Sequence, residues 1–155
     1  MNKKLICYFS ATGTTRSVAN KMAKVFNCDL FEIEPTKKYT DEDLDWTNDN
    51  SRSSVEAHDE SLRPSIIKKI DNLDLYDTIF IGFPVWWYKE PNIIDTFIEE
   101  NNLENKNVYV FVTSGSSTVE GSLESLREKY CNINFISGKR LDIYFDEVEI
   151  LNWIK

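Results

Sequence analysis

The sequence has few of the residues from which metal centres and disulfide frameworks are built. Its 155 residues include three cysteines and a single histidine, His58. The number of cysteines is odd and none are spaced as a Cys-x-x-Cys pair, so we expect free thiols in a reducing compartment. We therefore predict no metal site made from clustered histidine and cysteine. A hydrolase with a Ser-His-Asp or Cys-His arrangement would depend on His58 alone.

Positive charge and long apolar runs are also scarce. Eighteen lysines and arginines stand against 26 aspartates and glutamates, which gives a net charge of -8. Such a chain is a poor partner for nucleic acid or anionic membranes, although basic protein surfaces would attract it. Solubility alone explains the acidic surface equally well. No apolar run is long enough to cross a bilayer. A short apolar run follows Met1–Lys4, but no signal-peptide cleavage site comes after it. We expect a cytoplasmic protein.

The remaining composition is that of one globular domain over residues 1–155, with 41% hydrophobic and 28% charged residues. Apolar runs typical of buried strands lie at 4–9, 30–33, 78–82, 108–112 and 134–137. Apolar residues at helical spacing lie in 18–26, 66–70 behind Pro64, 93–98 behind Pro91, 119–130 and 148–154. Asp146 and Glu149 form a capping box for the last helix. This alternation predicts an α/β fold with a parallel sheet covered by helices on both faces. Ligands of such sheets bind outside the carboxyl ends of the strands.

The turn between the first strand and the first helix has the composition of an anion site. It reads Ser10-Ala11-Thr12-Gly13-Thr14-Thr15. A helix N-terminus offers unpaired N–H groups and partial positive charge, the hydroxyls add donors, and Gly13 lets the backbone approach an anion. The turn lacks the Gly-Lys-Ser/Thr of a Walker loop and the three spaced glycines of a dinucleotide fold. A turn that merely caps the helix is the alternative.

Ser10–Thr15 resembles the phosphate loop of flavodoxins, Thr/Ser-x-Thr-Gly-x-Thr, which holds the 5′-phosphate of FMN. The resemblance implies a flavodoxin-like three-layer sandwich with a five-stranded parallel sheet of order 2-1-3-4-5 and helices on both faces. It also implies FMN as the cofactor. Carried over by position, the phosphate would be held by Ser10, Ala11, Thr12, Gly13, Thr14 and Thr15.

Two later loops extend the resemblance. The segment Gly82-Phe-Pro-Val-Trp-Trp resembles the Tyr-Pro-Ile-Trp-Trp segment of a flavodoxin-like subfamily, where it lies beside the flavin ring. The resemblance implies flavin contacts from Pro84, Val85, Trp86, Trp87 and Tyr88, with at least one ring stacking on the flavin and at least one serving packing. Core packing or a dimer contact is the alternative. The third flavin loop of the family resembles the segment Ser114, Gly115 and Ser116. The alternative is an ordinary strand-to-helix turn, which would have a similar sequence.

The sequence departs from the family pattern in two places. Many flavodoxins have glycine after the aromatic residue, where a peptide turns over when the flavin takes one electron. Tyr88 and Lys89 stand there instead, and we expect a bulky side chain to raise the cost of that turnover. The second departure is a polar stretch from Pro35 to Arg63, in which Ser53 and Glu56 could cap a short helix. We interpret this stretch as a surface excursion anchored by Trp46. The alternative is a lid with Arg52 or His58 facing a substrate.

These observations predict an FMN-binding flavodoxin that transfers electrons between redox partners, as a monomer or homodimer. Its partners would be basic proteins or a small-molecule acceptor, and no catalytic residue is assigned because the cofactor supplies the chemistry. The alternative is an NAD(P)H-dependent FMN reductase of quinones or similar acceptors. A cofactor-free receiver-like module is disfavoured, because Ser10 and the Phe83-Pro84 turn supply no acidic residues where receivers need them.

Overall fold

The computed structural model describes residues 3–115 and 117–155 and places five parallel strands in one sheet of order β2-β1-β3-β4-β5. The strands are β1 (Lys3–Tyr8), β2 (Asp29–Glu32), β3 (Tyr76–Pro84), β4 (Asn107–Thr113) and β5 (Asn134–Arg140). The helices are α1 (Thr14–Phe26), α2 (Arg52–Ala57), α3 (Asn92–Glu100), α4 (Glu120–Lys129) and α5 (Glu147–Trp153), with a short 3-10 turn at Leu73–Leu75. The predicted fold class and strand order are confirmed.

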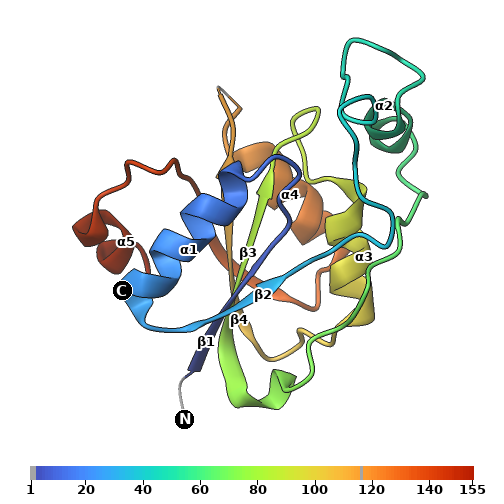
Figure 1. Cartoon of the computed structure of the whole chain (residues 1–155). Helices are drawn as coiled ribbons and strands as arrows, with labels where there is room; N and C mark the ends of the chain where they lie inside the picture. The colour runs from blue at the N-terminus through green and yellow to red at the C-terminus, as the bar shows by residue number, and fades with distance from the viewer. Residues whose placement is uncertain (1–2, 116) are drawn as a thin grey trace.

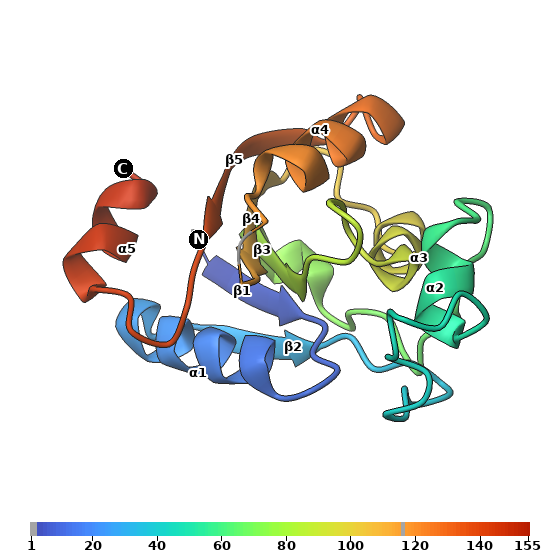
Figure 2. The ribbon, with the colours of Figure 1, turned by 90° about the horizontal axis from the view of Figure 1, so that it is seen from above.

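The sheet is the middle of three layers because successive side chains of each strand point to opposite faces. In β1, Leu5 and Cys7 join the apolar cluster under α3 and α4, whereas Ile6 and Tyr8 join the cluster under α1 and α5. Figure 2, looking from above, shows α1 and α5 on one side of the sheet and α3 and α4 on the other. Since the central strands are buried on both faces, they read as nearly continuous apolar runs.

The predicted helix behind Pro64 is wrong. Residues 64–70 form no helix, and Ile66 forms an isolated antiparallel bridge with Pro35. Backbone N–H groups of Thr36 and Ile67 donate to the carbonyls of Ser65 and Glu34, both at 2.9 Å. Ile66 packs on the core while Ile67 is 57% exposed, so neighbouring isoleucines alternate between core and solvent as in a strand.

A helix forms earlier in the polar stretch instead. It is α2, and its N-cap is Ser51, whose side chain accepts a hydrogen bond from the N–H of Ser54. The expected cap by Ser53 and Glu56 is therefore displaced by two residues. The cap of α5 is Asp146 as predicted, but its side chain accepts from Val148 N–H, and Glu149 pairs with Lys139 rather than completing a capping box.

The expected anchor of the excursion is also wrong. Trp46 is 73% exposed. Tyr39 takes the anchoring role, because its ring packs edge-on against Phe9 and Trp86 at centroid distances of 5.6 and 5.3 Å, and its hydroxyl donates to Glu56 Oε1 at 2.5 Å. The excursion is thus fastened to the sheet beside the carboxyl ends of the strands (Figure 1).

Candidate functional site

Three loops meet where the strand order reverses. β1 and β3 are neighbours in the sheet although β2 lies between them in the sequence, so the chain leaves β1 and β3 in opposite directions. The turns after β1, β3 and β4 all lie at the same end of the sheet, at the top of Figure 1. Ligands of open α/β sheets bind at such a point.

The turn after β1 is shaped around Gly13. Its φ of 97° is a left-handed conformation that few side chains adopt, and its N–H donates to Ser10 Oγ at 3.0 Å. Gly13 is the N-cap of α1, and within the described residues no side chain caps that helix. The first N–H groups of a helix have no partner inside the helix. The turn therefore presents unpaired donors at a positive helix end.

The hydroxyls of this turn divide into two kinds. Thr15 is buried, and its Oγ1 lies 2.8 Å from Thr113 Oγ1 at the end of β4, so it joins the first and third loops. Thr12 and Thr14 are exposed, with their hydroxyls 3.4 Å apart. The Thr12 and Thr14 side chains are therefore the ones placed to meet a ligand, while Thr15 offers its backbone N–H.

Arg16 does not add its charge to this turn. Its guanidinium lies 2.6 Å from Glu32 Oε2 at the end of β2. The turn 10–15 itself contains no lysine or arginine. An anion bound here would be held by neutral donors and the helix end.

The loop after β3 closes in a tight turn that we call the aromatic hairpin (Trp86–Lys89). Trp86 and Lys89 exchange backbone hydrogen bonds of 3.1 and 3.3 Å. The two residues between them, Trp87 and Tyr88, both have positive φ, 49° and 67°. This is a type I′ turn, which glycine, asparagine and aspartate normally fill. A left-handed conformation costs roughly 1–2 kcal/mol for each such side chain. The bulky residues therefore already occupy the positive-φ conformation that was expected to be costly for them.

Contacts from three parts of the chain, namely the turn after β1, the excursion and α4, hold the aromatic hairpin in place. The Trp86 ring packs against Phe9 and Tyr39, and the Trp87 ring lies 5.7 Å edge-on from His58. Lys89 Nζ pairs with Glu60 Oε1 at 2.5 Å. The backbone carbonyl of Tyr88 lies over Gly121 of α4, where an added Cβ would be 2.2 Å from that oxygen. The Tyr88 ring is 78% exposed, so the structure does not bring it into the hollow beside the loops.

The loop after β4 meets the other two. The N–H of Val85 donates to Thr113 O at 3.2 Å, and Ser114 Oγ donates to the carbonyl of Ser117. Gly115 is exposed with open space around it. Ser116, expected as a flavin contact, lies outside the described residues.

Two hollows flank the turn after β1. The larger, about 450 Å³, lies between that turn, the end of β2 and the start of the excursion. The smaller, about 210 Å³, lies between that turn and the aromatic hairpin; its walls are Ala11, Thr12, Thr14, Thr15, Leu44, Trp46, Ser53, Pro84, Trp86 and Trp87. Seven of these ten residues are among the predicted site residues.

Leu44, Trp46 and Ser53 are the residues of this smaller hollow that the sequence did not assign. All three come from the excursion, in which Ser53 was expected only as a helix cap and Trp46 only as an anchor. The two residues considered for a substrate are engaged elsewhere. Arg52 stacks over Tyr39 at 3.8 Å and pairs with Glu56, and His58 Nδ1 lies 2.7 Å from Ser54 O.

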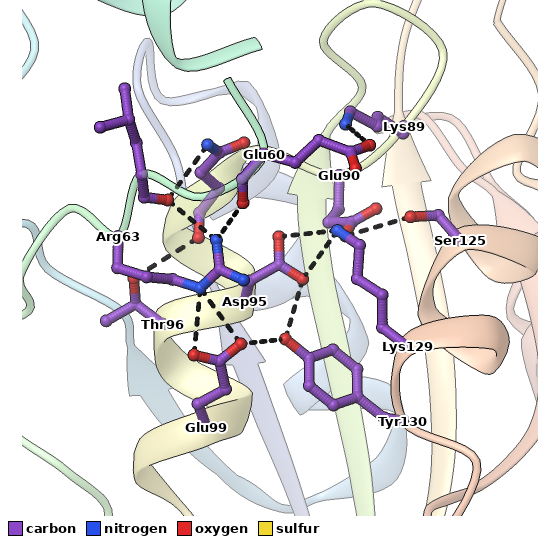
Figure 3. Close-up of polar contacts among 12 residues, drawn as sticks. Glu60, Arg63, Lys89, Glu90, Asp95, Thr96, Glu99, Ser125, Lys129 and Tyr130 are labelled. Carbon is purple, nitrogen blue, oxygen red and sulfur yellow. Dashed lines mark hydrogen bonds and ion pairs between the residues drawn. The ribbon is translucent and has the colours of Figure 1, made fainter. Parts of the chain in front are cut away.

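A cluster of charged groups lies behind the aromatic hairpin, between α3 and α4 (Figure 3). Glu90 and Asp95 are both buried and share Lys129, whose Nζ lies 3.0 Å from Glu90 and 3.3 Å from Asp95. Burial and the neighbouring Asp95 charge raise the pKa of Glu90 to about 7, against the opposing effect of Lys129. Glu90 directly follows the hairpin, so this cluster anchors the base of the loop.

Residues 3–115 and 117–155 contain no group of three or more His, Cys, Asp or Glu arranged to hold a metal ion. Nor is any helix in this part of the chain long and apolar enough to cross a membrane.

Comparison with known proteins identifies the same fold and a family. A family model described as flavodoxin matches residues 3–155. A candidate flavoprotein from Bacteroides eggerthii DSM 20697 is 44% identical with a TM-score of 0.96, over 99% of this chain and 96% of that one. A flavoprotein from Lactobacillus acidophilus NCFM, solved in complex with FMN, is 25% identical with a TM-score of 0.77 over the full length of both. A flavodoxin from the domain Archaea shares the fold at 16% identity and a TM-score of 0.57. No curated protein matches the sequence.

Proposed function

The chain belongs to the flavodoxin family, and from this premise we propose that it binds FMN and transfers electrons between redox partners. The observation that carries the proposal is the turn after β1: an uncapped helix N-terminus, a left-handed Gly13 and exposed Thr12 and Thr14 hydroxyls beside a hollow lined by Trp86 and Trp87. These are the donors for a phosphate and the apolar surfaces for a planar ring, side by side. The complex of the Lactobacillus protein with FMN supports the choice of flavin.

The residues present fit FMN by their chemistry. Ser10, Ala11, Thr12, Gly13, Thr14 and Thr15 would surround the phosphate, with Ser10 keeping the turn closed through Gly13 N–H. Pro84, Val85, Trp86 and Trp87 would flank the ring, and Ser114 with Gly115 would meet its pyrimidine end. Bound FMN supplies the capacity to accept and donate electrons. The protein binds and orients it, and the aromatic rings exclude water.

The acidic surface supports a carrier rather than a free-standing enzyme. The net charge of -8 favours encounter with basic protein surfaces. Among the described residues of the three loops, none is placed to act as a general acid or base. The single histidine, His58, packs against the ring of Trp87. A reductase that uses NADH or NADPH is the second candidate. The exposed Trp46 and Tyr88 rings favour it, because they offer apolar area for a second planar ring.

Purified protein tests this proposal, flavin-free for the binding measurement and loaded with FMN for the reduction. We expect isothermal titration calorimetry to give tighter binding of FMN than of riboflavin, because only FMN reaches the turn after β1. NADH or NADPH, added without oxygen, should leave the yellow colour unchanged, whereas dithionite should bleach it. Rapid bleaching by NADH or NADPH would contradict the electron-carrier function and support the reductase function instead. Failure to bind FMN would overturn both.

A further inference from the structure

The hydroxyl of Ser53 is a buried donor without a partner. Ser53 is 2% exposed, and its Oγ has no hydrogen-bond partner in the part of the chain that the structure describes. An unpaired buried hydroxyl is unfavourable, so natural structures keep few of them. The neighbouring Ser54 is buried too, but its hydroxyl accepts from Ser51 Oγ at 2.9 Å. Of these two neighbouring serines, Ser53 is therefore the one whose hydroxyl lacks a partner.

Ser53 lines the 210 Å³ hollow together with Thr12, Thr14 and Thr15. Ser53 thus lies at the same hollow as the uncapped N-terminus of α1, on the excursion rather than on the sheet. The other excursion residues at this hollow, Leu44 and Trp46, present mainly apolar surface. A ligand group that bonds Ser53 would also meet the neutral donors of the turn after β1.

Ser53 is held in this position without any ligand. Its own N–H donates to Asp43 O at 2.9 Å. The next turns of the excursion are fixed by Asn92, whose buried side-chain amide donates to three backbone carbonyls, those of Glu56, Asp59 and Leu62, at 2.8, 2.9 and 3.1 Å. A donor fixed in advance loses little entropy on binding.

We propose that Ser53 is a phosphate ligand: its hydroxyl donates a hydrogen bond to the phosphoryl group of FMN, so the excursion completes the site begun by the turn after β1. The inference rests on the proposed function. It assigns a binding role to a segment outside the three loops expected from the sequence. Ser53 shares its hollow with the helix end where negative charge is stabilised, and this favours the phosphoryl group as its partner.

The test compares FMN with riboflavin, which lacks the phosphate, in three proteins: wild type, Ser53→Ala and Ser122→Ala. Ser122 is the matched control, because its hydroxyl is also buried without a partner among the described residues, but on α4 and away from the hollow. We expect Ser53→Ala to weaken FMN binding about tenfold, the loss of one hydrogen bond to a charged group. Riboflavin binding should stay within about twofold, and Ser122→Ala should change neither.

Stability without flavin separates a ligand from a structural residue. Removing an unpaired buried hydroxyl should leave the unfolding temperature of the flavin-free protein unchanged or higher. In wild-type protein, inorganic phosphate should shift the amide NMR signals of Ser53 and Thr14 together. Unchanged FMN affinity in Ser53→Ala would mean that the hydroxyl meets only water, and would overturn the proposal. So would an equal loss for riboflavin and FMN, or a lowered unfolding temperature. Wild-type protein that binds no FMN would instead refute the proposed function itself.

Discussion

At the scale of single residues, Glu90 is a carboxylate kept where its charge is poorly solvated. Its side chain is fully buried, Asp95 repels it, and Lys129 must serve both acids. Because the pKa of Glu90 is raised from 4.5 to about 7 in the folded protein, the folded state holds a proton that the unfolded chain has already released. This group therefore stabilises the fold fully below its unfolded pKa and loses that contribution as the pH rises through about 7.

We predict that Glu90→Gln flattens the pH dependence of stability. Between about pH 5.5 and pH 8 the wild-type protein should lose about 2 kcal/mol of unfolding free energy through this residue, and the glutamine variant should lose little. Urea unfolding at a series of pH values measures the difference. Glu99→Gln is the control: although burial raises the pKa of Glu99, hydrogen bonds from Arg63 and Tyr130 hold it below its usual value. A wild-type curve as flat as that of Glu90→Gln would contradict the prediction.

At the scale of elements, α4 and the aromatic hairpin are fitted to each other through Gly121. The carbonyl of Tyr88 approaches so closely that no side chain fits on residue 121. The strained conformations of Trp87 and Tyr88 persist because this contact, the Lys89–Glu60 pair and the ring contacts of Trp86 fix the hairpin from several sides.

We predict that Gly121→Ala destabilises the protein and weakens FMN binding several-fold. In an open helix the same change stabilises by roughly 0.5–1 kcal/mol, so the sign of the effect reports the contact with Tyr88. Differential scanning calorimetry and flavin titration give the two values. Glu124→Ala, on the exposed side of the same helix, serves as the comparison. A raised unfolding temperature with normal FMN affinity would show that the hairpin does not depend on this glycine.

The elements also show how far sequence patterns reach. Apolar runs and the turn at Gly13 depend on neighbours in the sequence, so the strands and this turn were predictable from local patterns. The strand order and the meeting of three loops followed from the resemblance to flavodoxins. The isoleucines of 66–70 share spacing with a helix, but pairing with Pro35, more than thirty residues away, decides their conformation. Tyr39 rather than Trp46 anchors the excursion because the rings of Phe9 and Trp86 pack against the Tyr39 ring. The burial of Ser53 likewise depends on distant parts of the chain, so no local sequence pattern could predict it.

At the scale of the whole molecule, the proposed function requires a chain of net charge -8 to bind a dianionic phosphate. The turn 10–15 supplies no cation, and Arg16 is neutralised by Glu32. In the proposed complex, local donors would hold the phosphate against the repulsion of the negative charges elsewhere on the protein. Dissolved ions screen that repulsion over about one Debye length.

We predict that FMN affinity rises several-fold when salt is increased from about 10 mM to about 150 mM, where the Debye length falls from about 30 to about 8 Å. Riboflavin affinity should change much less, since it carries no charge. Titration calorimetry at the two salt concentrations gives both constants. A decrease of FMN affinity with salt would instead indicate a phosphate site built on lysine or arginine.

The placement of the tryptophans has a photophysical consequence. Trp46, Trp86 and Trp87 line the hollow, whereas Trp153 packs against Phe80 and Tyr109 on the other side of the sheet and donates to Ser137. Flavins absorb light in the range where indole emits. Energy transfer falls steeply with separation, so a flavin bound in the hollow quenches these three indoles most strongly. The residual emission of the loaded protein then comes chiefly from Trp153 and reports the packing of the opposite layer.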